Sequence, residues 1–423
     1  MKKVALLIVL VFFIGTFARG LIVQFKDEPS KTPIRTFADY VNHLKSVTEN
    51  GIKAISDEVE RGNYKVLWIA RAVYLPNGDA NLMKKLQKNP KVAKVYPDFI
   101  VPLMKPVAEK DAKTPNNWNI RDFAVEKVWK DFHLTGKGII VGQIDTGVEG
   151  DHPDLKGKIV YWRDFLSNSL PVDHPVDSVG HGTHTAGTIC GGSASGVPIG
   201  VAPDAKIAAA RCFSWFGANT HDILDAMQWL LDPDGDPNTT NDRPRVINNS
   251  WGGPISHLSV FEDAVKAWVK AGIVPVFSAG NSGPNPRTIA APAASKLAIA
   301  VAALKTTTEV ASFSSRGPAV VNGEEYIKPD IAAPGQNVYS AIPGKKWGYK
   351  SGTSMAGPFI AGVVALMLEA NPNLTVDDVK KLLYKHAIDL GAPGKDNDYG
   401  WGVVNVYETV KEAYGKRLPS YDE

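Results

Sequence analysis

Between about residue 118 and residue 412, short apolar runs alternate with longer stretches whose apolar positions recur at helical spacing. The runs expected to form strands are Gly138–Ile144, Lys206–Arg211, Val246–Asn248, Ile273–Phe277 and Leu297–Ala302. The stretches expected to form helices are His181–Cys190, His221–Leu231, Val260–Ala271 and Ser354–Ala370. Apolar strands separated by helices are typical of a parallel sheet covered on both faces. The pattern predicts an α/β fold with a doubly wound, mostly parallel sheet, which binds ligands at the carboxyl ends of its strands.

A smaller α+β unit is expected over residues 19–104. Its predicted strands are Gly20–Phe25, Lys65–Ala70 and Val92–Tyr96, and its predicted helices are Thr36–Glu60 and Asn81–Lys88. A polar segment, residues 105–117, follows it and is interpreted as a linker. The second domain is then residues 118–423.

The first 18 residues have the pattern of a secretory signal peptide. Lys2 and Lys3 precede an apolar run, Val4–Ile14, which is followed by small residues at Thr16 and Ala18. These are the three parts of such a signal, and we expect cleavage after Ala18 and a secreted, extracellular protein. A buried N-terminal strand or helix is the alternative. No other apolar run approaches the roughly 20 residues of a bilayer span, so none is expected in the mature protein.

Composition narrows the possible partners. The 423 residues are 44% hydrophobic and 22% charged, as in an ordinary globular protein, and their net charge is only +3. Because this charge is small, it gives no reason to expect nucleic acid or an anionic membrane as a partner. The two cysteines, Cys190 and Cys212, could form one disulfide bridge or remain two buried thiols.

Three short segments carry the residue types of a hydrolytic triad. Asp145 ends an apolar run in Ile-Asp-Thr-Gly, His181 opens a predicted helix in Gly-His-Gly-Thr-His, and Ser354 opens another in Gly-Thr-Ser-Met-Ala. A serine hydroxyl becomes a good nucleophile when an imidazole accepts its proton, and a carboxylate must hold that imidazole in the correct tautomer. Each residue alone has a simpler interpretation, such as a helix N-cap for the serine. All three together favour catalysis.

Two further polar residues bear on this chemistry. Asn281 lies in Ser-Ala-Gly-Asn-Ser-Gly, and a side-chain amide beside the nucleophile can donate a hydrogen bond to a tetrahedral oxyanion. Asparagine next to glycine is also a common turn signal. His184 lies one turn after His181, and this spacing without a glutamate gives only weak support for a metal-binding pair.

The order Asp145, His181, Ser354 and the three surrounding motifs resemble those of subtilisin-like serine proteases. The resemblance covers residues 118–412, and residues 21–104 resemble the inhibitory propeptide of such precursors, most clearly at Val95-Tyr96-Pro97-Asp98. It implies a monomeric, autoprocessed endopeptidase whose partners are polypeptide substrates and its own propeptide. Cleavage after Met104 would place Val101-Pro102-Leu103-Met104 in the enzyme's own subsites. The polar segment up to Thr114 offers other cleavage sites.

The same resemblance implies a set of substrate-binding residues. One pocket wall is expected from Ser250, Trp251 and Gly252, the other from Ala279 and Gly280, and a strand-like edge from Phe216 and Gly217. Small walls without a carboxylate favour large apolar residues at P1, and main-chain recognition favours broad specificity. Asp242 and Arg243 lie nearby in the sequence and leave the P1 preference open.

Calcium is the metal that the sequence indicates. Asp154 resembles a calcium ligand of the family, although its usual partner loop, here residues 191–198, lacks the expected asparagine. Asp232, Asp234 and Asp236 alternate around a turn that contains Gly235, as carboxylates do in calcium loops. A solvated acidic loop is an equally good interpretation of that segment.

Two other functions compete with hydrolysis. A catalytically dead peptide-binding relative would normally lack a triad or oxyanion residue, and labelling by a serine-directed phosphonate would identify it. An acyl-transferring enzyme would need to exclude water from the acyl-enzyme, and no large insertion that could form a lid is evident. A nucleotide-binding enzyme is disfavoured because no Gly-x-Gly-x-x-Gly follows the strand that ends at Ile144.

Overall fold

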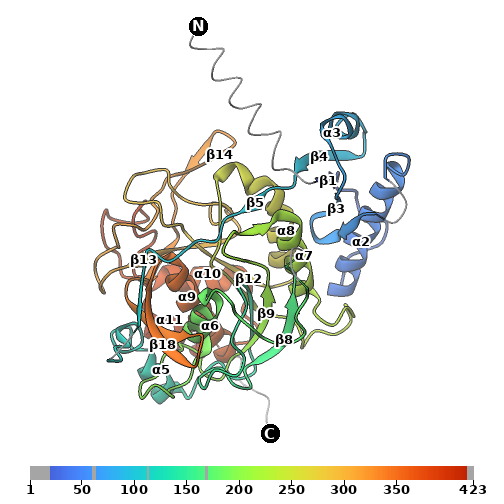
Figure 1. The fold of residues 1–423 in the computed structure, drawn as a ribbon. Helices are drawn as coiled ribbons and strands as arrows, with labels where there is room; N and C mark the ends of the chain where they lie inside the picture. The colour runs from blue at the N-terminus through green and yellow to red at the C-terminus, as the bar shows by residue number, and fades with distance from the viewer. Residues whose placement is uncertain (1–19, 60–62, 112–113, 167–169, 417–423) are drawn as a thin grey trace.

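A computed structural model describes residues 20–59, 63–111, 114–166 and 170–416. The predicted signal peptide therefore lies outside the described residues. The larger part is built on a seven-stranded sheet in the order β16-β13-β12-β11-β7-β9-β8 (Figure 1). All neighbouring strands are parallel. In chain order they are β7 (Ile140–Asp145), β8 (Ile159–Asp164), β9 (Lys206–Arg211), β11 (Val246–Asn249), β12 (Val274–Ser278), β13 (Ile299–Leu304) and β16 (Ile331–Pro334).

Helices cover both faces of this sheet, which confirms the predicted fold class. One layer holds α4 (Trp118–Arg121), α5 (Val125–Phe132), α6 (His181–Cys190), α9 (Thr353–Ala370), α10 (Val376–Lys385) and α11 (Val406–Gly415). The opposite layer holds α7 (Thr220–Leu231) and α8 (Leu258–Lys270). Consecutive residues of β11 face different layers, because Val246 packs with the first group and Ile247 with the second.

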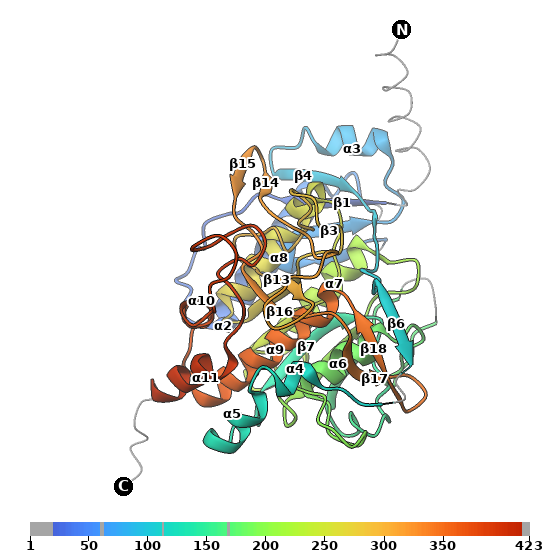
Figure 2. The same cartoon turned by 90° about the vertical axis from the view of Figure 1, so that its left-hand side faces the viewer.

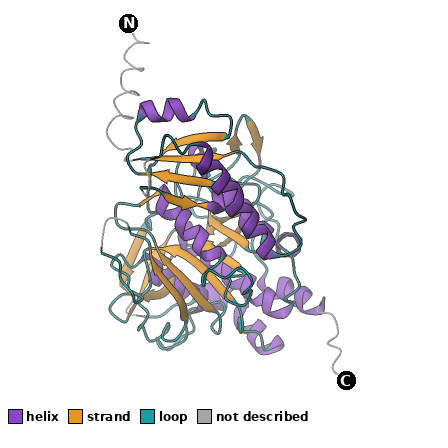
Figure 3. Ribbon diagram, turned by 90° about the vertical axis from the view of Figure 1, so that its right-hand side faces the viewer, coloured by secondary structure: helices purple, strands orange, loops and turns teal. Residues whose placement is uncertain are grey.

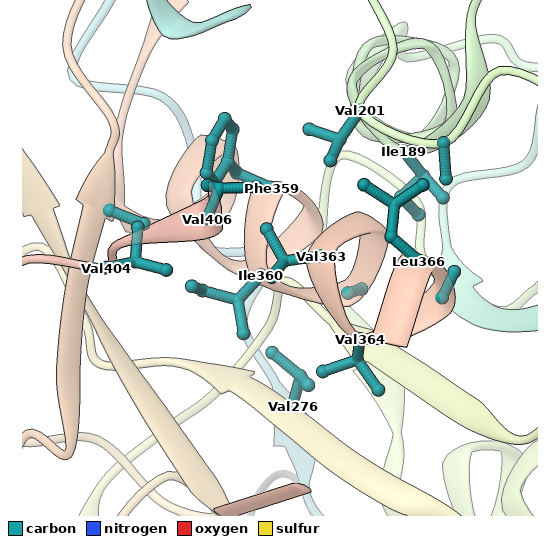
Figure 4. Close-up of a cluster of buried hydrophobic side chains, with 14 of the residues drawn as sticks. Ile189, Val201, Val276, Phe359, Ile360, Val363, Val364, Leu366, Val404 and Val406 are labelled. Carbon is teal, nitrogen blue, oxygen red and sulfur yellow. The ribbon is translucent and has the colours of Figure 1, made fainter. Parts of the chain in front are cut away.

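Helix α9 forms the centre of the first layer. Every residue except Glu369 is buried, and Ile360, Val363 and Leu366 pack among side chains from the sheet and from α6 (Figure 4). In the part of the chain that the structure describes, it is the one helix long and apolar enough to cross a membrane, but 94% of it is buried within the fold. Its apolar sequence therefore serves the protein core.

The N-terminal unit is a four-stranded antiparallel sheet, β2-β3-β1-β4, with two helices. Its elements are β1 (Leu21–Phe25), α2 (Phe37–Ala54), β2 (Lys65–Leu67), η1 (Trp68–Ala70), β3 (Ala72–Leu75), α3 (Ala80–Leu86) and β4 (Val92–Pro97). The predicted strand Lys65–Ala70 is wrong in its second half, which is a 3₁₀ turn. Its side chains are buried against α7 and α8, the helices beside the N-terminal unit in Figure 1, and this contact replaces strand pairing.

Residues after the N-terminal unit also pair with the larger part. The segment 105–117, expected to be a linker, contains β6 (Ala108–Asp111), which pairs with β18 (Lys346–Ser351), and β18 pairs with β17 (Val338–Ile342) (Figure 2). The free edge of β18 supplies backbone partners that a polar sequence can use. The remaining elements are β5 (Ile100–Val101), β10 (Ala218–Asn219), η2 (Ile255–His257), β14 (Ala319–Val321) and β15 (Glu324–Tyr326).

The colouring by secondary structure shows the seven-stranded sheet, the N-terminal sheet and the helices packed on them (Figure 3).

Cys190 and Cys212 are free, buried thiols, and burial raises the pKa of both. Neither is therefore poised as a reactive thiolate at neutral pH.

The packing of α9 generates a stability prediction. Leu366→Ala should lower the free energy of unfolding by about 2–5 kcal/mol, because it leaves a cavity among fully buried neighbours. Urea unfolding of the full chain, in a Ser354→Ala background to avoid proteolysis, measures this loss. Lys411→Ala, at an exposed position on α11, is the control and should change stability by less than about 0.5 kcal/mol. Equal values for both variants would contradict the assigned core.

Candidate active site

The carboxylate of Asp145 and the ring of His181 form a buried pair. Asp145 is the last residue of β7 and His181 the first of α6, and both are almost inaccessible to solvent. The ring Nδ1 donates to Asp145 Oδ1 at 2.7 Å. Thr146 N–H donates to the same oxygen at 2.7 Å, and Thr185 Oγ1 to Oδ2 at 3.2 Å. These contacts fix the tautomer of the imidazole and leave its Nε2 to act on other groups.

Asp177 holds the start of α6 in place, a role that the sequence analysis missed. Its two oxygens accept hydrogen bonds of 2.8–3.0 Å from the Thr146 and Thr183 hydroxyls and from the backbone N–H groups of Val179, Gly180 and Thr183. Burial raises the pKa of Asp177, although these donors oppose the shift. The sequence did contain a signal for this role: Asp177 comes just before a predicted helix, where a carboxylate can accept hydrogen bonds from the free N–H groups of the first turn.

Ser354 is the second residue of α9, which packs against α6. Its buried hydroxyl lies 3.2 Å from the carbonyl oxygen of Met104 and 3.3 Å from that of Ser250. Nε2 of His181 is buried and has no hydrogen-bond partner among the described residues. The Asp–His half of the predicted triad is therefore joined by a hydrogen bond, while the serine hydroxyl contacts the peptide segment in front of it.

Asn281 lies beside the same peptide segment. Its Oδ1 accepts hydrogen bonds from the backbone N–H and the hydroxyl of Thr353, at 2.8 and 2.9 Å, and its Nδ2 donates to the Lys105 carbonyl at 3.2 Å. The amide is thus anchored at the N-terminus of α9. Its donor faces the carbonyl one residue beyond Met104, whereas an oxyanion role at this bond requires it to face the Met104 carbonyl.

Residues 102–105 form one wall of a cleft of about 570 Å³, which Gly252, Gly280 and Asn281 also line. At one end Val101 and Ile100 pair with Ala218 and Asn219 as antiparallel strands. At the other end, the Cε of Met104 lies 3.3 Å from the position that a Cβ on Gly252 would take. An extended segment therefore lies along an edge strand, with its last apolar side chain in a pocket, which is the arrangement of a peptide bound by strand addition.

Comparison with known proteins gives the fold and site a family context. The profile described as "Subtilase family" matches residues 136–402, the region that contains the Asp145, His181, Asn281 and Ser354 segments. The chain belongs to the subtilase family. Its enzyme class is accordingly that of the serine endopeptidases.

Three similar subtilases come from bacilli. Bacillopeptidase F of Bacillus subtilis (strain 168) is 34% identical over 90% of this chain and 29% of its own length. Serine protease AprX of the same strain is 38% identical over 66% of this chain and 67% of its own length. A thermophilic serine proteinase of Bacillus sp. (strain AK1) is 30% identical over 94% of this chain and 88% of its own length. This subtilase therefore spans under a third of bacillopeptidase F.

The structure separates the predicted substrate-binding residues into two groups. Gly252 and Gly280 line the cleft, and Gly217 approaches the backbone of Val101 so closely that a Cβ there would lie 2.3 Å from its carbonyl oxygen. The side chains of Ser250, Trp251 and Ala279 are buried, so these residues can contact a substrate only through their backbone, and the side chain of Phe216 is 85% exposed. Their backbone follows the family pattern, but motif position alone does not show where a side chain points.

The N-terminal unit contacts the subtilase domain through η1 and through charged groups. Ile69 N–H donates to Gln228 at 3.2 Å, and Arg71 forms an ion pair of 2.7 Å with Asp263. Asp98 accepts 2.7 Å and 3.1 Å hydrogen bonds from the ring and backbone of His221, at the start of α7. Burial lowers the pKa of His221, but Asp222 and Asp98 outweigh it and raise the pKa to about 9. A charged imidazole therefore links the two units at neutral pH.

The predicted calcium ligands are only partly brought together. Asp154 is buried, and its two oxygens accept hydrogen bonds from Ala194 N–H at 2.7 Å and Trp347 Nε1 at 2.6 Å, so it links the loop at Ala194 to strand β18. Asp236 is not part of the group that converges; its Oδ1 accepts hydrogen bonds from the backbone N–H and the side-chain amide of Asn238. Asp232 and Asp234 converge with Asp242 instead.

His184, the alternative metal ligand, is a core residue. It is fully buried, its Nε2 lies 3.1 Å from the Val338 carbonyl, and burial holds its pKa well below the usual range. Among the described residues, no group of three metal-ligating side chains includes His184 or His181.

The contacts of Asp177 predict a catalytic effect. Asp177→Asn should lower kcat of the processed enzyme by about 10- to 100-fold with little change in KM, because a shifted α6 misplaces His181. Steady-state hydrolysis of a peptide substrate measures both constants, and a thermal melt confirms folding. Asp173→Asn, at an exposed position, is the control and should leave both constants unchanged. An unaltered kcat in a folded Asp177→Asn enzyme would contradict this role.

The contact between Gly252 and Met104 predicts a specificity change. Gly252→Val should reduce kcat/KM for substrates with Met or Phe at P1 by about 10- to 200-fold, because the added methyl groups occupy the pocket. Substrates with Ala at P1 should lose less. Gly415→Val adds the same side chain where a Cβ meets no atom within 4 Å, so it is the control. Equal losses for all P1 residues would show that the pocket has been placed wrongly.

Proposed function

We propose that this subtilase is a secreted, broadly specific endopeptidase, made as a precursor that cuts itself after Met104. The observation that carries the proposal is the 3.2 Å approach of Ser354 Oγ to the Met104 carbonyl, within a segment that lies in the cleft as a substrate would. Residues 1–18 are the signal peptide, 19–104 the inhibitory propeptide, 105–117 a connecting segment and 118–423 the peptidase domain.

The mechanism follows from the groups around that carbonyl. Asp145 holds Nδ1–H of His181, and the free Nε2 accepts the proton of Ser354 as Oγ bonds to the Met104 carbonyl carbon. The imidazolium then gives this proton to the nitrogen of Lys105, the peptide bond breaks, and an acyl-enzyme forms. Water, deprotonated by the same imidazole, releases the acid and restores the serine.

The oxyanion formed in each step needs two donors. The backbone N–H of Ser354, at the positive end of α9, supplies one, and Asn281 Nδ2 supplies the other. Asn281 already contacts the adjacent carbonyl, so a small movement of the peptide along the cleft brings the Met104 oxygen to it. Reaction at this bond also requires Ser354 Oγ to turn from the carbonyl toward His181.

A preference for large apolar P1 residues is supported by the lining of the cleft. Among the described residues that line it, none is acidic, so Lys or Arg at P1 would have no charged partner. Asp242 is not part of this lining. Two cationic residues line the cleft: Lys105, which follows Met104, and Arg287, which is paired with Glu325 at 2.9 Å.

Inhibition by the propeptide is supported by its position. Residues 102–104 lie along the cleft, while η1 and Asp98 bind α7 and Arg71 binds α8 on the adjacent face. Both contacts must be lost before a substrate can enter. We propose that the processed enzyme is a monomer that acts on polypeptides after the propeptide leaves.

Mass measurement of two purified proteins tests self-processing. The wild-type chain should yield a product that begins at Lys105, whereas Ser354→Ala should keep the junction intact because it has no nucleophile. Ser193→Ala, at an exposed serine, is the control and should process like the wild type. Labelling with a serine-directed phosphonate should mark only proteins that keep Ser354. Equal trimming of wild type and Ser354→Ala would show that another protease makes the cut.

A further inference from the structure

Three carboxylates converge in the loop that joins α7 to β11. One oxygen from each of Asp232, Asp234 and Asp242 lies within 4.8 Å of the other two. Asp232 and Asp242 are only 8% and 3% exposed. Like charges this close repel, and burial adds a desolvation cost, so a compensating partner is needed.

Among the described residues no side chain forms an ion pair with these carboxylates, and the charges of Lys45 and Arg243 act on Asp232 and Asp242 only from beyond ion-pair distance. Oδ1 of Asp232 is buried and accepts no hydrogen bond from any residue that the structure describes. Arg243 is next in the chain, but its guanidinium lies 4.0 Å from the ring centre of Phe37, and its Nε and Nη1 are unpartnered.

The position on the helix increases the electrostatic cost. Asp232 is the C-cap of α7, where the free carbonyl groups already concentrate partial negative charge. An anionic side chain is unfavourable at this end, and a cation is favourable. A buried, unpartnered carboxylate at a helix C-terminus therefore indicates a bound cation.

We propose that Asp232, Asp234 and Asp242 bind a calcium ion. The ligand atoms are all oxygens, which suits a hard divalent cation and not zinc. Oxygens about 2.4 Å from one calcium ion are at most about 4.8 Å apart, so three carboxylate oxygens that lie within 4.8 Å of one another are close enough to share one ion. Water molecules on the exposed side, next to Asp234, complete the coordination.

The loop is already shaped for this site. Asp234 Oδ1 accepts a hydrogen bond from Asp236 N–H at 2.8 Å across a turn in which Gly235 has φ 82°. Asp242 Oδ2 accepts one from Asp234 N–H at 3.3 Å. The site therefore closes the loop between α7 and β11. Helix α7 follows β10, which pairs with residues 100–101, and β11 leads to the pocket wall at Gly252. Bound calcium should stabilise both elements.

Terbium luminescence on the full-length Ser354→Ala chain tests the proposal. Terbium(III) replaces calcium at oxygen sites, and Trp229, whose Nε1 donates to Pro233 at 3.1 Å, lies close enough to sensitise its emission. Asp232→Asn and Asp242→Asn should each weaken binding by about tenfold or more. Asp236→Asn removes a neighbouring charge outside the cluster, so it is the matched control and should bind as the parent does.

Calcium titration of the same four proteins gives the second readout. The parent and Asp236→Asn should bind one more calcium ion than Asp232→Asn and Asp242→Asn. Added calcium should also raise the melting temperature of the parent and of Asp236→Asn by more than it raises that of the other two variants. Circular dichroism confirms that each variant is folded. Equal stoichiometry in all four proteins, or a loss in Asp236→Asn equal to that in Asp242→Asn, would overturn the proposal.

Discussion

The burial of α9 against the parallel sheet is the constraint on which the rest of the structure depends. Because the helix is apolar on every side, it can be stable only at the centre of the fold, and the sheet then fixes its direction. Its N-terminus lies at the edge where β7 ends. Ser354 and Asp145, more than 200 residues apart in the chain, therefore approach the same place without any direct bond between them.

The second constraint is that polar groups at this edge need partners. Asp145 has three donors and Asp177 has five, so neither carboxylate is left to move. This arrangement restricts the His181 ring to one orientation while Nε2 stays available. The α7–β11 loop is the opposite case: Oδ1 of Asp232 has no hydrogen-bond partner among the residues that the structure describes, and this deficit is the physical basis for proposing calcium there.

The N-terminal unit uses two kinds of contact at once. Trp68 and Ile69 bury apolar surface on the layer that contains α7 and α8, while Arg71 and Asp98 pair with charges on those helices. The segment that follows then enters the cleft as an added strand. Such binding depends mainly on backbone hydrogen bonds, so a cleft of this kind can accept segments of different sequence.

The local pattern of the sequence determined most of the central sheet and the residue types of the candidate site. Strands that are buried on both faces are apolar at nearly every position, so their sequences stand out from those of the helices between them. The bounds of the central strands and of helices α6 to α9 were therefore predicted closely; these strands are β7, β9, β11, β12 and β13. The edge strands β8 and β16 were missed because β8 is only partly buried and ends in Arg163 and Asp164, and β16 (Ile-Ala-Ala-Pro) ends in a proline. The motifs identified Asp145, His181, Asn281 and Ser354 because their chemistry needs those residue types in those settings.

Only the tertiary structure decided which side chains meet. Sequence spacing suggested Asp236 as a calcium ligand, yet the turn at Gly235 directs it away and the return of the chain brings in Asp242. Trp251 belongs to the pocket motif but points into the core, and Lys65–Ala70 is apolar enough for a strand but ends in a turn against α7 and α8. A residue's type is a local property, whereas its partners depend on how distant segments pack, and no local pattern contains that information.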